Sequence, residues 1–186
     1  MKDKDTHFSI RPILDGEADK CEQILRSLPE WFGIEEAIVE YRHDIEAMDT
    51  YVTEISGKVV GFITLNQHNE FSAEIHAMAV SGEHHGHGLG RALVEHAEQM
   101  LRSRSVEYLE VKTLGPSRPN EHYERTRGFY FTLGFRPLEE NQLWGEVNPC
   151  LIMIKHIRGQ LNDQGVSAIS DRAGPPASAP DRHWRG

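Results

Sequence analysis

A ten-residue segment in the first half of the chain combines four glycines with three histidines. It reads GEHHGHGLGR (82–91) and lies between an apolar run and a segment with a helical apolar stripe. Glycine permits backbone conformations that a Cβ forbids, and the first N–H groups of a helix have no intrahelical partner. Because the helix dipole adds partial positive charge there, Gly86, Gly88 and Gly90 predict an anion site that suits a diphosphate.

This glycine spacing differs from that of two well-known phosphate loops. A P-loop continues with Lys and then Ser or Thr after its last glycine, whereas this chain has Arg91 and then alanine. The dinucleotide fingerprint G-x-G-x-x-G is not matched either. On these residues alone, a plain tight turn between a strand and a helix remains the alternative.

A second group of reactive side chains lies on the strand that precedes this loop. Strict alternation along residues 72–80 predicts that four side chains share one face: Glu74, His76, Met78 and Val80. A carboxylate on a central strand is costly unless it is paired or used, which makes Glu74 a candidate general base. His76 is the second candidate, because imidazole titrates near neutral pH.

The loop histidines do not form a metal-binding pattern. His84, His85 and His87, even with His76 nearby, match no standard zinc spacing. A loop that binds phosphates also cannot easily fold around a cation. We therefore predict no metal site.

The bulk composition excludes several classes of protein. The 186 residues carry a formal net charge of −9 and only two cysteines, which argues against nucleic-acid binding and against a disulfide framework. An acidic surface is compatible with a cationic amine substrate. No run approaches 18 apolar residues and the N-terminus has no apolar signal region, so we expect a cytoplasmic protein without a membrane span.

The elements that position these residues follow from hydrophobic periodicity and turn signals. We expect strands at 8–14, 50–55, 58–67, 72–80, 106–114, 136–144 and 149–157. We expect helices within 15–33, at 34–48, at 88–104 and within 121–134. The result is an α/β fold with a mixed central sheet of six to seven strands and about four helices. Its strand–helix–strand crossover at 72–114 predicts two parallel, buried central strands.

Composition also divides the chain into two parts. Residues 1–158 are expected to form a single domain. Residues 159–186 are rich in Pro, Ala and Ser and lack periodicity, which predicts a disordered C-terminal tail.

Two segments resemble motifs of the GNAT superfamily of acyl-CoA-dependent N-acyltransferases. EIHAMAVSGEHHGHGLGRALVEHAEQML (74–101) is similar to its acetyl-CoA motif, in which a strand ending in apolar-Ala-Val precedes [Q/R]-x-x-G-x-[G/A] and a helix. His85 stands where Gln or Arg is usual. RTRGFYFTLGFRPL (125–138) is similar to the fourth-helix pattern F-Y-x-x-x-G-F, with Phe129 and Tyr130 opening the match. The resemblance implies a GNAT fold.

The resemblance also implies acetyl-CoA as co-substrate and a set of contacts to it. These fall on Met78, Ala79, Val80, His85, Gly86, His87, Gly88, Leu89, Gly90, Arg91, Tyr123 and Tyr130. Within this set the Val80 N–H is expected to polarise the thioester carbonyl. Tyr123 occupies a place where many members have Asn.

The implied reaction is direct acetyl transfer to a primary amine of a small molecule or peptide. Histone-type members use the Glu of their AEI strand as base, so Glu74 or a water chain is expected to take the amine proton, with His76 as backup. The resemblance places the Tyr130 hydroxyl near the thioester sulfur as general acid. The rival hypothesis is a non-catalytic acyl-CoA-binding or regulatory module, and a homodimer is compatible with the superfamily.

Overall fold

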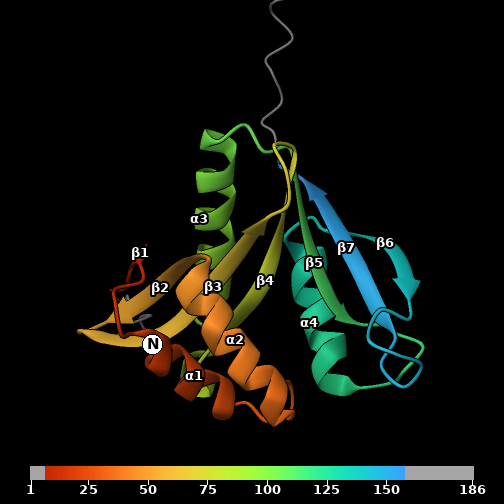
Figure 1. The fold of residues 1–186 in the computed structure, drawn as a ribbon, viewed down its shortest axis with the longest axis horizontal. Coiled ribbons are helices and arrows are strands. Elements are labelled where there is room, and N and C mark those ends of the chain that lie inside the picture. Colours follow the sequence, from red (N-terminus) through yellow and green to blue (C-terminus); the bar gives the residue numbers. More distant parts are fainter. Residues whose placement is uncertain (1–6, 158–186) are drawn as a thin grey trace, which may run out of the picture.

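The structure, a computed structural model, describes residues 7–157 (Figure 1). The strands are β1 (Ser9–Pro12), β2 (Asp49–Ile55), β3 (Lys58–Gln67), β4 (Ser72–Val80), β5 (Tyr108–Leu114), β6 (Arg136–Asn141) and β7 (Cys150–His156). The α-helices are α1 (Ala18–Arg26), α2 (Glu35–Ala47), α3 (Leu89–Ser103) and α4 (Glu121–Thr132). The expected α/β class, with a mixed sheet and four helices, is confirmed. The predicted tail at 159–186 lies outside the described residues.

The seven strands form one sheet in the order β1-β2-β3-β4-β5-β7-β6. Only β4 and β5 pair in parallel, as the crossover through α3 predicts, and the other neighbours are antiparallel. Helices α1 and α2 cover one face of the sheet, and α3 and α4 cover the other (Figure 1). Each face therefore has its own apolar core.

Strand β4 does not keep the strict alternation that the sequence suggested. Thr64 and Leu65 are consecutive on β3, yet they pair with Ala77 and Ile75, so His76 is an extra residue in β4. A one-residue bulge inverts the faces of everything beyond it. The prediction of one shared face for residues 74, 76, 78 and 80 is therefore wrong: Met78 and Val80 pack into the α3/α4 core.

Helix α1 is shorter than the span from which it was predicted. It ends at Arg26, and Pro29 disfavours a helical conformation at the residue before it. Residues 27–34, which join α1 to α2, therefore belong to neither helix, and Trp31 lies in this connecting segment. Within residues 7–157 no helix is both long and apolar enough to cross a lipid bilayer.

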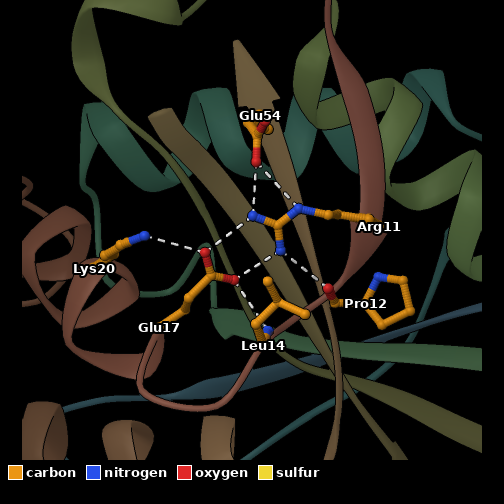
Figure 2. A network of polar contacts seen from close by, with 6 residues as sticks. All are labelled: Arg11, Pro12, Leu14, Glu17, Lys20 and Glu54. Carbon is orange, nitrogen blue, oxygen red and sulfur yellow. Dashed lines mark hydrogen bonds and ion pairs between the residues drawn. The ribbon is translucent and has the colours of Figure 1, made fainter. Parts of the chain in front are cut away.

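A partly buried ion-pair network joins β1, α1 and β2 (Figure 2). The Arg11 guanidinium donates to both carboxylate oxygens of Glu17, at 2.7 and 2.9 Å, and to Glu54 at 2.7 Å. The Leu14 N–H and the Lys20 ammonium also donate to Glu17. The Arg11 bonds, helped by those of Leu14 and Lys20, lower the pKa of Glu17 to about 2 despite its burial. This network holds the start of the α1–α2 unit against the sheet.

Candidate active site

Strands β4 and β5 separate halfway along their length. They pair only from Ser72 to Ile75 on β4, opposite residues 108–111 of β5. Beyond that point β4 continues beside β3 as far as Val80, while β5 continues beside β7 as far as Leu114. Within the described residues, the side of β4 that faces β5 has no ladder partner from His76 onward. The sheet is therefore open at the carboxyl end of its parallel pair (Figure 1).

The glycine loop ends beside this opening and forms the start of α3. Gly86 and Gly88 have φ of +77° and +82°, which an L residue rarely adopts, and Gly88 is the left-handed N-cap of the helix. Within residues 7–157 no acceptor meets the N–H groups of residues 89–91, as expected for a first helical turn. Leu89 is 1% exposed and anchors this turn in the core, so its amide rather than its side chain is presented.

Gly90 serves a different purpose from the other two glycines. A Cβ on Gly90 would lie 3.4 Å from the ring of Phe129 on α4, at the close limit of van der Waals contact, and Gly90 has no left-handed φ. Arg91 is half exposed and lies 3.8 Å from Glu95 of the next turn. His87 is exposed between the two left-handed glycines.

His85, which replaces the usual Gln or Arg, ties the loop to the end of β4. Its Nε2–H donates to the carbonyl of Val80 at 2.7 Å. Its ring also meets the edge of Trp31, with 6.0 Å between ring centroids. His85, which was expected to contact the cofactor, therefore also forms contacts within the protein that join the loop to β4 and to Trp31. Ala79, one residue before Val80, packs on the α1/α2 side.

Tyr130 lies on the α4 side of the sheet and is only 5% exposed. Its ring packs against Phe129 and Phe135, with centroid distances of 5.1 and 5.3 Å. Burial raises the pKa of this phenol well above its usual value, so the hydroxyl stays protonated. Within the described residues the Tyr130 hydroxyl has no hydrogen-bond partner.

Glu74 lies on the opposite face, in a cluster of charges shared by β4 and β5. It is 7% exposed, and the Lys112 ammonium lies 2.8 Å from it and 3.0 Å from Glu110. Burial opposes the charge of Lys112, but its hydrogen bonds to the two carboxylates prevail and raise its pKa. His68 lies 3.3 Å from both carboxylates. The carboxylate of Glu74 is therefore paired rather than free.

Three of these side chains have the spacing of metal ligands. Among residues 7–157, the one group of this kind is formed by His68, Glu74 and Glu110, away from the loop histidines. The Lys112 ammonium already provides positive charge between the two carboxylates. A structural ion pair is the simpler account of this group.

His76 points to α2 and contacts a carboxylate there. Its Nε2–H donates to Oδ2 of Asp44 at 2.7 Å. The edge of the Tyr41 ring lies beside the imidazole, with centroids 5.7 Å apart. Burial and the negative charges of Glu74 and Asp44 raise the pKa of Tyr41. The α2 face of the opening is thus acidic.

The segment between α1 and α2 is fastened to α4 through Trp31. The Trp31 Nε1–H donates to Thr126 Oγ1 at 3.0 Å, and the Tyr123 hydroxyl donates to the Trp31 carbonyl at 2.9 Å. The His122 ring meets Trp31 at 4.9 Å. Tyr123, expected at a cofactor-contacting position, therefore bonds to the protein itself, and its role toward the cofactor stays a prediction.

The comparison with known sequences decides the family. Residues 18–135 match the model of the Acetyltransferase (GNAT) family. The chain belongs to this family. It is an acetyl-CoA-dependent acyltransferase, as the resemblance of its two motifs predicted.

Individual relatives of this GNAT protein are distant. An uncharacterized N-acetyltransferase of Chlorobaculum tepidum is 27% identical over 146 residues, covering 76% of this chain and 79% of the relative. A GNAT-family acetyltransferase from Desulfovibrio desulfuricans superposes with a TM-score of 0.73 at 16% identity, over 81% of this chain and 99% of the other. An acetyltransferase from Salmonella typhimurium, solved with acetyl-CoA, gives a TM-score of 0.63 at 16% identity, over 92% of this chain and 99% of the other.

Sequence reasoning about this GNAT protein missed three residues near the opening. Lys112 and Glu110 could have been found, because alternation along β5 places them on the side that Glu74 faces on β4. Asp44 carried no such signal. It lies among many carboxylates of α2, and only the packing of that helix against β4 selects it.

Proposed function

We propose that this GNAT protein is an N-acetyltransferase that moves the acetyl group of acetyl-CoA directly to a primary amine of a small molecule or peptide. The observation that supports it best is the opening between β4 and β5. His76 lies at the start of this opening and Glu74 two residues before it, both on the α2 face, and the phenol of Tyr130 lies on the α4 side of the sheet. This arrangement supports two reactants that approach from opposite faces of the sheet.

The cofactor would be bound mainly by backbone groups. The free N–H groups of residues 89–91 suit the pyrophosphate, since they combine hydrogen-bond donors with the positive end of the helix dipole. From Met78 to Val80, β4 pairs with β3 on one side and, within residues 7–157, has no strand partner on the β5 side. This open side suits the pantetheine and the thioester. In this arrangement the Val80 N–H polarises the thioester carbonyl as charge develops on its oxygen.

The chemistry requires one group to accept a proton and another to donate one. A base on the α2 face, Glu74, His76 or a water that they hold, takes a proton from the ammonium form of the substrate. The amine nitrogen then attacks the thioester carbon, and the carbon–sulfur bond breaks. Tyr130 donates its proton to the departing thiolate, a role that fits a hydroxyl with no hydrogen-bond partner within residues 7–157. The acetylated nitrogen then releases its second proton, and the phenol regains one from solvent.

The charge around the opening favours an amine acceptor. Glu74 and Glu110 share the ammonium of Lys112, and Asp44 adds a third carboxylate beside His76, so among these side chains the carboxylates outnumber the ammonium. Such a surface attracts a cationic substrate, although a cation must lose its proton before it reacts.

The test is acetyl-CoA turnover followed as free thiol release. The panel contains small amines, amino acids, aminoglycosides, a peptide with a free N-terminus and one with a free lysine. We expect at least one amine to accelerate thiol release well above hydrolysis, with the acetylated amine found by mass spectrometry. Tight acetyl-CoA binding without turnover on any amine would favour the rival, a non-catalytic acyl-CoA-binding module.

A further inference from the structure

The bulge in β4 determines where His76 points. His76 has no ladder partner on β3, because the register passes directly from Ile75 to Ala77. It has none on β5 either, because the parallel pairing stops at Ile75. A bulge re-aims a side chain and is common beside active sites. Here it brings the imidazole to α2, at the point where the sheet opens.

Asp44 holds that imidazole in one orientation. The carboxylate accepts the Nε2–H at 2.7 Å, across 32 residues of sequence. The two side chains are 23% and 33% exposed, so a substrate can reach the pair. Since Nε2 carries the hydrogen, Nδ1 of the neutral ring has its lone pair free, and within residues 7–157 it has no hydrogen-bond partner.

We propose that His76 is the general base of this acetyltransferase and that Asp44 is its positioning residue. The proposal rests on the proposed function. Nδ1 accepts the proton that the substrate ammonium loses, and the carboxylate of Asp44 stabilises the imidazolium that forms. The amine lone pair forms the new carbon–nitrogen bond, the carbon–sulfur bond breaks, and the thiolate takes a proton from Tyr130. The acetylated nitrogen then releases its second proton, and a proton from solvent restores the Tyr130 hydroxyl. His76 then returns its proton to solvent.

Glu74 is less suited to this role. Its carboxylate pairs with Lys112 at 2.8 Å and lies 3.3 Å from His68. A proton on Glu74 would therefore break a nearly buried ion pair, which is costly. Within residues 7–157 His76 itself forms no ion pair with a cation, since its partner is the carboxylate of Asp44. The titratable groups that face it are Asp44 and Tyr41 from α2 and, along β4, Glu74 with its partner Lys112.

The experiment is the pH profile of kcat/KM for an amine that the wild type acetylates. Asp44→Asn keeps the shape of the side chain and removes its charge. We expect kcat to fall at least tenfold while the Kd for acetyl-CoA stays within twofold. The fall in kcat should come without a matching rise in the KM for the amine, because Asp44 acts through the imidazole and not on the substrate.

Two further variants isolate this role from a structural one. Glu46→Gln makes the same acid-to-amide change on α2 at an exposed residue paired with Arg42, and should leave the profile unchanged. His76→Gln keeps a polar side chain at the bulge and should abolish the acidic limb. It therefore tests the base even if Asp44→Asn does not fold.

Two results would overturn the proposal, and they differ. In the first, the wild type is active, the pH profile of Asp44→Asn superimposes on that of the wild type, and the acidic limb disappears in Glu74→Gln. This result excludes His76 as base and Asp44 as its positioning residue, and it leaves the acetyltransferase function intact. In the second, the wild type binds acetyl-CoA but acetylates no amine. This result excludes both the proposed acetyltransferase function and the proposed roles of His76 and Asp44.

Discussion

Replacing Gly88 by alanine tests the proposed anion-binding role of the glycine loop most directly. Gly88 has φ of +82°, and a Cβ there would meet no protein atom within 4 Å. The loss of stability is therefore conformational, about 1–2 kcal/mol for an L residue in this region. In a chain of this length that corresponds to a fall in Tm of roughly 2–8 °C.

Gly57 provides a matched control for this change. It lies in the turn between β2 and β3, with φ of +80° and again no protein atom within 4 Å of a Cβ. Gly57→Ala should therefore lower Tm by a similar amount. Only Gly88→Ala places a methyl group where the phosphates would approach the first turn of α3.

The two variants should differ in their affinity for acetyl-CoA. A lost hydrogen bond to a charged group costs about 1.5–3 kcal/mol, which corresponds to roughly 10- to 150-fold weaker binding. Isothermal titration calorimetry on the two variants and the wild type measures the difference. If Gly88→Ala binds acetyl-CoA as tightly as Gly57→Ala does, the helix start does not hold the phosphates.

Three other changes test single contacts. Tyr130→Phe should lower kcat at least tenfold and leave the Kd for acetyl-CoA within twofold; an unchanged kcat would remove this phenol from the mechanism. Glu17 has its pKa lowered to about 2 from 4.5, so its contribution to stability is complete above about pH 4.5 and is lost as the pH falls toward 2. Glu17→Gln should cost about 2 kcal/mol at pH 7 by urea denaturation and flatten that acid-side loss, and an unchanged slope would contradict the assignment. Trp31→Phe removes the Nε1–H donor to Thr126 and should cost about 1 kcal/mol of unfolding free energy; equal stability would show that this bond contributes nothing.

Local patterns were enough to predict most of the fold. The order of strands and helices, the parallel pair β4 and β5 and the start of α3 at the glycine loop all depend on neighbours in sequence. Periodicity and turn chemistry act over a few residues, so they can be read directly from the chain. The family follows from two motifs of the same local kind, at 74–101 and 125–138.

Only the tertiary structure decided how the candidate acid–base residues are arranged. Strict alternation assigned Glu74, His76, Met78 and Val80 to one face, and a single bulged residue reversed the last two. Register depends on the strand beside β4, and a shift of one residue exchanges the faces.

The amino-acid sequence by itself determined the elements, the glycine loop and the presence of a base candidate on β4. The packing of α2 against β4 placed Asp44 beside His76, and the register of β5 against β4 placed Lys112 beside Glu74. These pairs join residues more than thirty positions apart. Their geometry depends on how whole elements pack against each other, which no local pattern encodes.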